Sequence, residues 1–458
     1  MNSNKMDGGR YQPISDMYDG KSVFVTGCTG FLGKVFVEKI LYRCPKIEKV
    51  YVLIRETEKI SAEEKFKKML DCPLFERLRR DRPQDLEKVI PIIGDISEPN
   101  LGITLEDEEL LLENVSIVFH FAATIKFNEP LQVAINVNLE GTRRVLDLVI
   151  KMKKIPLFLY VSTAFSNPNI QVVEEVVYPP PIPLSDIDAI MEHTTFSEEQ
   201  TRTILNGSSN TYTFTKALAE NLVVKFHEQT GIPTIIVRPS IMVSCKDEPM
   251  SGWIDNWFGA TALVVTDSKG LNRAIFADGR NTIDLIPADY VANLIIVAAA
   301  RCQRSKNVQV YNSCSSAVNP ITLRELDRLT TRDSIKNRTY ELPLPGVFFI
   351  RSRWIMAIVV FILEILPAYI GDCILIFLGK KQKYIKMQSR VTGVRKALEP
   401  FTSRTWTMKS VNTSALSKSL SPTDRRTFAC EAKYINWEEF IPTYFHGIRK
   451  YLLDIKNN

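Results

Sequence analysis

Short apolar runs alternate with longer mixed segments from residue 21 to about residue 300. The runs are rich in valine, isoleucine and phenylalanine, which is typical of strands buried on both faces of a parallel sheet. The segments between them are long enough for helices, and such alternation indicates an α/β fold. We therefore predict a parallel sheet with helices on both sides, whose strands lie at residues 23–25, 50–54, 90–96, 115–121, 157–161 and 235–237.

A continuous apolar pattern covers residues 354–378. As one helix this segment would be about 37 Å long, enough to cross a bilayer core of about 30 Å. Glu364 and Asp372 would each cost roughly 2.5–3.5 kcal/mol at mid-bilayer, and Pro367 interrupts the middle of the segment. We therefore expect a helical hairpin that dips into one leaflet, with a hairpin buried against the rest of the protein as the alternative.

Composition narrows the class of protein. The eight cysteines are scattered without C-x-x-C pairs, which is typical of reduced thiols in a cytosol-facing protein. The four histidines show no spacing that suggests zinc, and we predict no metal site. Residues 1–20 are polar and lack the apolar core of a signal peptide.

Glycines recur at every third position of the loop after the first predicted strand, at Gly27, Gly30 and Gly33. The first permits a tight turn, the second lets the backbone approach a pyrophosphate, and the third allows a helix to pack closely on the strand. A helix that begins here presents its N-terminus to the phosphates. The loop predicts a dinucleotide site. Its expected contact residues are Thr26, Gly27, Thr29, Gly30, Phe31, Leu32 and Gly33.

Tyr212 and Lys216 stand four residues apart and share one face of a helix. A phenol with a pKa of about 10 is a usable proton donor at neutral pH, and a lysine cation beside it lowers that pKa. Ser162 and Thr163 follow a predicted strand, where ligands of α/β sheets bind. These groups predict a site where tyrosine protonates a carbonyl oxygen while a nicotinamide delivers hydride to its carbon.

The glycine loop, the strand-end hydroxyls and the Tyr-Lys pair together resemble an extended short-chain dehydrogenase/reductase, with a Rossmann-type doubly wound parallel sheet. The resemblance implies that Thr163, which an alanine follows, is the catalytic hydroxyl, and that Ser162 is the second choice. It implies that Asn138 supports catalysis by bonding backbone near the site, and that His120 is a packing residue. It assigns further cofactor contacts to Asp95, Ile96, Ala122, Lys216 and Pro239.

Arg55 predicts which nicotinamide cofactor is bound, because it ends the second strand. An acidic residue there would bind the ribose 2′-hydroxyl of NAD, whereas arginine suits a 2′-phosphate. The expected cofactor is therefore NADPH.

The C-terminal part sharpens the resemblance. Residues 367–372, 379–381, 436–440 and 447–453 resemble the C-terminal domain of fatty acyl-CoA reductases. The resemblance implies reduction of long-chain acyl-CoA to a primary alcohol by two hydride transfers, with an aldehyde intermediate and release of coenzyme A. Many insect members continue into a hydrophobic tail, whereas this chain ends at Asn458, which resembles the shorter pheromone-gland type.

We divide the chain into five parts: a polar N-terminal segment (1–20), the reductase domain with a substrate-side lobe (21–300), a connecting region (301–353), a membrane-associating hairpin (354–378) and a mostly helical, basic C-terminal domain (379–458). The last part carries 16 Lys and Arg against 6 Asp and Glu, and the remainder carries 42 against 46. Anionic lipid or coenzyme A phosphates are the expected partners of this basic region, and a solvated basic surface without a specific partner is the alternative. Nothing resembles a motif that binds nucleic acid.

Four questions stay open at this point. Trp253, Trp257 and Phe258 line an acyl channel or belong to the core. We expect the cytosolic face of the endoplasmic reticulum membrane, with the peroxisomal membrane as the alternative. A 3β-hydroxysteroid dehydrogenase or a sugar-nucleotide epimerase shares the Tyr-Lys pair, and a non-catalytic NADPH-binding scaffold is the least favoured function. The sequence does not indicate an oligomeric state.

Overall fold

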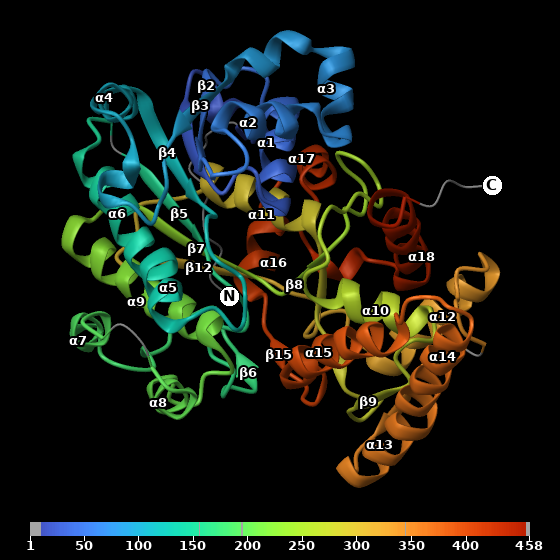
Figure 1. Cartoon of the computed structure of the whole chain (residues 1–458). Coiled ribbons are helices and arrows are strands. Elements are labelled where there is room, and N and C mark those ends of the chain that lie inside the picture. Colours follow the sequence, from blue (N-terminus) through green and yellow to red (C-terminus); the bar gives the residue numbers. More distant parts are fainter. Residues whose placement is uncertain (1–10, 155, 194–195, 344, 455–458) are drawn as a thin grey trace, which may run out of the picture.

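A parallel sheet forms the centre of the protein (Figure 1). The computed structural model describes residues 11–154, 156–193, 196–343 and 345–454. Within these residues the main sheet has seven strands in the order β12–β7–β5–β4–β1–β2–β3, all parallel. The strands are β1 (Ser22–Thr26), β2 (Lys49–Ile54), β3 (Val89–Ile93), β4 (Val115–His120), β5 (Leu157–Val161), β7 (Thr234–Pro239) and β12 (Gln309–Ser313). The order reverses between β1 and β4, which is the switch point where doubly wound sheets bind ligands.

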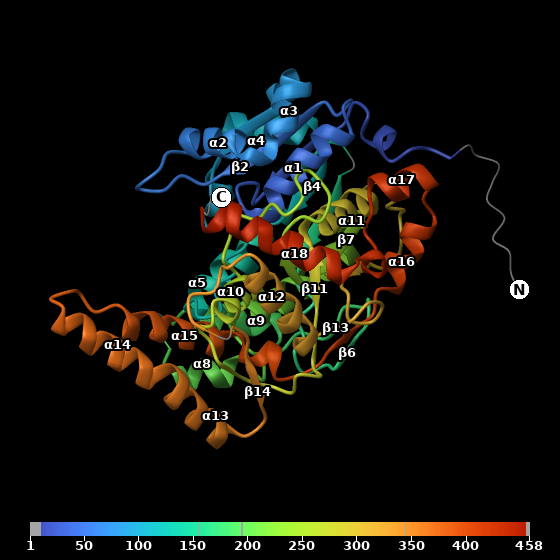
Figure 2. The same cartoon turned by 90° about the vertical axis from the view of Figure 1, so that its right-hand side faces the viewer.

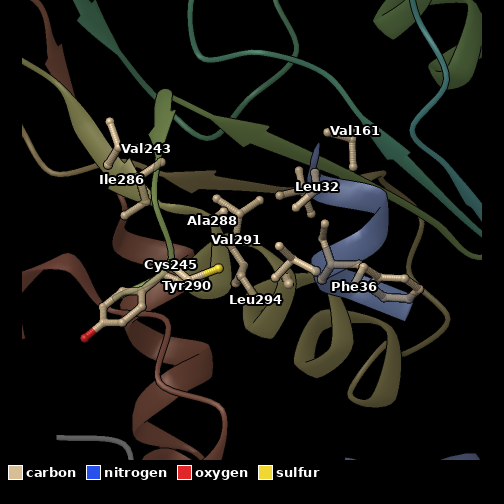
Figure 3. Close-up of a cluster of buried hydrophobic side chains, with 14 of the residues drawn as sticks. Leu32, Phe36, Val161, Val243, Cys245, Ile286, Ala288, Tyr290, Val291 and Leu294 are labelled. Atoms are coloured by element: carbon tan, nitrogen blue, oxygen red, sulfur yellow. The ribbon is translucent and has the colours of Figure 1, made fainter. Parts of the chain in front are cut away.

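Helices cover both faces of this sheet, as its apolar strands require. Along β1, Val23 and Val25 belong to the core beneath α1 (Phe31–Arg43) and α11 (Ala288–Ala300), whereas Phe24 belongs to the opposite core. Figure 3 shows the first of these cores, where side chains of α1 meet side chains of α11. The second core lies beneath α4 (Leu105–Asn114), α5 (Leu131–Ile135), α6 (Gly141–Lys151) and α9 (Thr211–Thr230). The predicted α/β class and doubly wound topology are confirmed.

Shorter elements surround these layers. The remaining helices before the apolar segment are α2 (Ala62–Asp71), α3 (Glu76–Asp81), α7 (Ile187–Met191), α8 (Glu198–Ile204), α10 (Ala260–Ser268) and α12 (Leu323–Lys336). Pairs of short strands lie outside the main sheet: β6 (Val172–Val173) with β15 (Thr407–Met408), β8 (Ile241–Val243) with β11 (Leu285–Pro287), β9 (Ala274–Phe276) with β14 (Phe348–Ile350), and β10 (Thr282–Ile283) with β13 (Ile321–Thr322).

The prediction that residues 301–353 only connect two domains is wrong. This region supplies β12, which extends the main sheet beside β7, and α12, which packs against α10. The prediction failed because Gln309–Ser313 is a polar edge strand with only alternate residues buried along most of its length, so it carries no apolar run. The reductase sheet therefore ends at Ser313 and not near residue 300.

The N-terminal and C-terminal parts both pack on the reductase core. Residues 1–10 of the polar N-terminal segment lie outside the described residues, but Tyr18 is buried and its hydroxyl donates to the Ile296 carbonyl at 2.7 Å. The C-terminal helices are α15 (Tyr384–Thr402), α16 (Val411–Lys418), α17 (Pro422–Thr427) and α18 (Trp437–Gly447). Phe440 and Tyr444 of α18 share one hydrophobic core with α1 and α11, so the C-terminal part is mostly helical, as expected, but has no separate core.

The apolar segment is one projecting helix and not a hairpin (Figure 2). It runs from Arg353 to Phe377 through α13 (Arg353–Val360), a π-helical turn (Phe361–Ile365) and α14 (Leu366–Phe377). The hairpin expectation failed because Pro367 stands at the start of α14, where the π turn accommodates its missing N–H without ending the helix. The chain turns back only after Leu378, and α15 then packs along α14.

The two acidic residues of this helix face the protein. Glu364 is buried and lies 2.8 Å from Arg395 of α15. Asp372 is buried and accepts hydrogen bonds from the backbone N–H groups of Lys383, Tyr384 and Ile385, so it caps the beginning of α15. The charges that argued against a lipid-facing helix are therefore satisfied on its inner face, and its outer face is apolar.

Candidate active site

The glycine loop joins the end of β1 to the beginning of α1. Gly27 has φ +72°, and a Cβ there would lie 2.6 Å from the backbone nitrogen of Ala122. A Cβ at Gly33 would overlap the Gly27 carbonyl, so α1 begins directly against the loop. Thr29 and Gly30 are exposed at the N-terminus of α1. The loop therefore offers backbone N–H groups and a positive helix end to an anion, as a dinucleotide pyrophosphate requires.

Thr26 ties the loop to the neighbouring strand. Its hydroxyl accepts hydrogen bonds from the backbone N–H groups of Phe121 and Ala122, each at 3.2 Å, and lies 2.7 Å from Nδ1 of His120. The other ring nitrogen of His120 lies 3.0 Å from the Thr142 hydroxyl. Burial, aided by the charge of Lys216, lowers the pKa of His120 to about 3, so this ring is neutral and acts as a packing and positioning group.

Tyr212 and Thr163 come together across the end of β5. Burial raises the pKa of Tyr212 to about 12, and the neighbouring Thr163 hydroxyl opposes part of that rise. Ser162 is also buried, but its hydroxyl has no hydrogen-bond partner among the described residues. The structure thus places Thr163, and not Ser162, beside the tyrosine.

Lys216 lies one helical turn further along α9 and is buried. Its Nζ donates to the Val161 carbonyl at 2.7 Å and lies 4.5 Å from the centre of the Tyr160 ring. Burial lowers the pKa of the Lys216 ammonium to about 7, and the carboxylate of Glu220 opposes part of that fall. These two contacts of the Lys216 ammonium, with a backbone carbonyl and an aromatic ring of β5, could not be predicted from the residues next to Lys216 in the sequence.

Asn138 lies in a π-helical turn (Asn136–Glu140) and joins the loop after β4 to α9. Its Oδ1 accepts from the Thr124 N–H at 2.8 Å, and its Nδ2 donates to the Thr124 carbonyl and to the Thr215 hydroxyl, both at 3.0 Å. Both amide hydrogens are therefore used. This side chain positions the residue before Lys216 and has no proton left to give to a ligand.

Comparisons with known proteins decide the family. Two family models, both described as male sterility protein, match residues 25–295 and 363–454, and the first is an NAD-binding model. Fatty acyl-CoA reductase 1 of Xenopus laevis is 36% identical over 449 residues, which are 96% of this chain and 86% of the relative. Fatty acyl-CoA reductase 1 of Homo sapiens is 34% identical over 446 residues, with the same coverage. The chain belongs to the fatty acyl-CoA reductase family.

Members of this family are oxidoreductases, and the matching NAD-binding model agrees with the glycine loop in assigning a nicotinamide cofactor. Among solved structures, the terminal reductase domain of the myxalamid pathway superposes with a TM-score of 0.62 at 18% identity, covering 95% of this chain and 92% of that domain. This likeness shows that the fatty acyl-CoA reductase chain has the fold of that domain. The comparison covers the sheet and the C-terminal helices alike.

The residues predicted to contact the outer part of the cofactor lie along the same sheet edge. Arg55 follows β2 with 60% of its side chain exposed, and its Nε lies 3.7 Å from the Asp95 carboxylate. Ile96 is buried against Gly141, where a Cβ would lie 3.1 Å from it. The Pro239 carbonyl accepts the N–H of Ala164, the residue after Thr163, at 2.9 Å.

The aromatic residues that the sequence left open lie in two environments. Trp253 is 1% exposed, and its ring stacks on that of Phe31 at a centroid distance of 5.4 Å, so it belongs to the core behind the glycine loop. Trp257 and Phe258 are exposed at the surface, in the loop before α10. Among the described residues, no group of three or more His, Cys, Asp or Glu side chains has the arrangement of a metal site.

Proposed function

We propose that this protein reduces long-chain acyl-CoA to a primary alcohol with NADPH, in two successive hydride transfers. The observation that carries the proposal is that Tyr212 and Thr163 are neighbours at the end of β5, beside the dinucleotide loop, in a chain of the fatty acyl-CoA reductase family. The relatives are named fatty acyl-CoA reductases. A 3β-hydroxysteroid dehydrogenase or an epimerase is not favoured, because the family match covers the C-terminal helices as well.

The residues of the site divide the work of each reduction. Thr163 and Tyr212 both bond the substrate carbonyl oxygen, and Tyr212 gives it a proton. The positive charge of Lys216 stabilises the phenolate that remains. Bound NADPH supplies the hydride to the carbonyl carbon. The first reduction gives a hemithioacetal. When it collapses, the Tyr212 phenolate takes back the hydroxyl proton, the carbon–sulfur bond breaks, and coenzyme A leaves as a thiolate that solvent protonates. A second NADPH would supply hydride to the aldehyde carbon while Tyr212 protonates its oxygen, and the phenolate then regains a proton from solvent.

The test uses purified full-length protein with NADPH and hexadecanoyl-CoA. We expect hexadecanol, free coenzyme A and two NADPH consumed for each alcohol, measured by mass spectrometry and by absorbance at 340 nm. One NADPH for each product, with free hexadecanal, would contradict the second reduction. UDP-galactose and 3β-hydroxysteroids should give no turnover.

The preference for NADPH over NADH rests on Arg55. Its guanidinium is exposed at the carboxyl end of β2, next to Asp95, where a ribose phosphate of a bound dinucleotide would lie. A charge-assisted bond to that phosphate contributes about 1.5–3 kcal/mol, or roughly ten- to a hundredfold. Arg55→Asp should therefore weaken NADPH by this factor and leave NADH nearly unchanged. Equal kcat/KM for both cofactors in the wild-type protein would contradict the assignment.

We also propose that the helix from Arg353 to Phe377 lies in the cytosolic leaflet of the endoplasmic reticulum membrane. Within the described residues it is the helix with the length and apolar composition of a membrane span. Trp354 at one end is 83% exposed and Phe377 at the other is 90% exposed. Glu364 and Asp372 hold the inner face of this helix against α15. The opposite, apolar face is therefore available to lipid. The exposed lysines beyond its end, Lys380, Lys381 and Lys383, suit anionic headgroups.

Membrane attachment is tested by fractionating cells and by imaging with organelle markers. Wild-type protein should stay with membranes in moderate salt. Replacing the exposed side chains of Ile358, Phe361 and Ile362 with glutamine should release it without loss of NADPH binding. A matched control replaces Ile335, which is equally exposed on α12. Release of the wild-type protein by salt alone would contradict insertion of the helix into the membrane. Co-localisation with peroxisomes would show that the protein is attached to the peroxisomal membrane and not to the endoplasmic reticulum.

A further inference from the structure

An aromatic cluster connects the two groups that bind the carbonyl to the C-terminal helix α15. Phe127 lies in the loop after β4, and its ring centroid is 6.2 Å from that of Tyr212 and 5.4 Å from that of Phe401 on α15. Phe165 follows Thr163 by two residues, its N–H donates to the Thr163 hydroxyl at 3.3 Å, and its ring lies 5.0 Å from that of Phe401. Phe401 therefore contacts one aromatic residue beside each of the two hydroxyl groups.

The inner part of this cluster is held firmly. The Trp406 ring lies 5.5 Å from that of Phe165 and 6.3 Å from that of Phe401, and its indole N–H donates to the Pro168 carbonyl at 3.3 Å. Phe165, Phe401 and Trp406 are buried, each with 7% of its surface exposed. The cluster thus has a packed base that includes two residues from the C-terminal part of the chain.

The outer part of the cluster is open. Tyr212 and Phe127 are only half-buried. The loop that carries Phe127 is tied to the first residue of α9, because the Thr211 hydroxyl donates to the carbonyl oxygens of Phe127 and Glu129 at 3.3 and 3.1 Å. The exposed edge of this aromatic wall therefore lies next to the phenol that must reach the substrate.

The geometry of a bound carbonyl defines what such a wall contacts. An oxygen shared by Tyr212 and Thr163 places the carbonyl carbon, and so the first carbons of the acyl chain, within van der Waals reach of the side chains around these hydroxyls. Burial against aromatic rings removes the methylene groups of an acyl chain from water and so stabilises the bound chain. An apolar wall here suits a hydrocarbon chain better than a sugar or another polar group.

We propose that Phe127, held in place by Phe401 of α15, forms the wall against which the first methylene groups of the acyl chain pack. The inference rests on the proposed function, since it takes Tyr212 and Thr163 as the carbonyl-binding pair. It makes Phe127 the residue that meets the acyl chain, and it makes Phe401 of the C-terminal half the residue that positions Phe127.

The experiment compares hexadecanoyl-CoA with 2-methylhexadecanoyl-CoA, which differ by one methyl group at the carbon beside the carbonyl. Phe401→Ala removes the ring that supports Phe127, so Phe127 can move away from this methyl group. The kcat/KM for the branched substrate relative to the linear one should therefore rise at least fivefold. Phe401→Leu, which nearly conserves volume, should shift the ratio in the same direction by a smaller factor. Circular dichroism and NADPH binding establish that each variant is folded.

Phe440→Ala is the matched control, because Phe440 is equally apolar and buried but packs on Trp437 and Tyr444 in α18. It should change the rates for both substrates alike and leave their ratio within twofold. An unchanged ratio in Phe401→Ala and Phe401→Leu would overturn the inference and assign the cluster to packing alone. The proposed function fails separately, if wild-type protein reduces neither substrate or if Tyr212→Phe retains full activity.

Discussion

The glycine loop and helix α15 both support the candidate site, but they differ in the atoms that make their close contacts. Gly27 lies against the backbone of Ala122, and Gly33 lies against the Gly27 carbonyl, so each glycine is required by a close approach of backbone. Helix α15 instead makes contacts through side chains, Arg395 with Glu364 and Phe401 with Phe127, and it is about 28 Å long. The loop is packed backbone at one point, whereas α15 works as a strut between two separate surfaces.

Because of this difference, we expect the two regions to respond differently to substitutions. The loop tolerates no added atoms, because its glycines lie against backbone that cannot move aside. The strut tolerates changes on its exposed face but not at its buried ion pair, where loss of one partner leaves a charge without compensation. The following predictions test that contrast and the site that lies between the two regions.

The largest effect is expected at the phenol. Tyr212→Phe should lower kcat for alcohol formation by about 10²–10⁴-fold, because it removes the proton donor while keeping the ring against Phe127. The Kd for NADPH, measured by fluorescence, should stay within about threefold of wild type. Tyr434→Phe, at an exposed position, is the control and should be neutral. A loss of less than tenfold in Tyr212→Phe would remove tyrosine from the role of acid.

The next effect tests the strut. Glu364→Ala should lower the free energy of unfolding by about 3–5 kcal/mol, since it leaves the buried Arg395 guanidinium unpaired. Glu64→Ala breaks an exposed pair with Lys68 and should cost less than about 1 kcal/mol. Denaturant titration of both variants measures the difference. Similar small losses would show that α15 does not depend on its buried ion pair.

Two helical glycines offer a direct comparison of the two regions. Gly33→Ala places a methyl group onto the Gly27 carbonyl and should weaken NADPH binding and cost roughly 2–4 kcal/mol of stability. Gly393→Ala adds a methyl group to the open face of α15, where no atom lies within 4 Å. It should stabilise the protein by roughly 0.5–1 kcal/mol. If both variants are destabilised alike, the contrast between the regions does not hold.

The smallest expected effect is a pH dependence of cofactor affinity. The pKa of Lys216 is lowered to about 7, so its cation is present below that value and lost as the pH rises through it. The anionic cofactor favours the cation, and its Kd should therefore rise several-fold between about pH 6 and about pH 9. Lys216→Met should bind more weakly at low pH and show a flatter profile. A wild-type Kd that is constant over this range would contradict the role of the cation.

Much of the reductase half was readable from local pattern. Apolar runs predicted the strands, and regularly spaced glycines predicted the dinucleotide loop. The four-residue spacing of tyrosine and lysine predicted that the two share one helix face. The polar edge strand β12 could not be predicted, because Gln309–Ser313 has no apolar run and is a strand only through its pairing with β7. In the C-terminal half the reading of 354–378 as a hairpin failed, because the partners of Glu364 and Asp372 lie on α15 and do not appear in the segment itself.

The sequence by itself determined the chemistry of the site: a glycine loop for a dinucleotide, a tyrosine and a lysine on one helix face, and hydroxyls at a strand end. Spacing suffices there because strand, loop and helix have fixed local geometry. Only the tertiary structure decided which hydroxyl neighbours Tyr212, that the Val161 carbonyl accepts a hydrogen bond from Lys216, and that Phe401 packs on Phe127. These choices depend on contacts between residues far apart in the chain, which packing selects and no local pattern encodes.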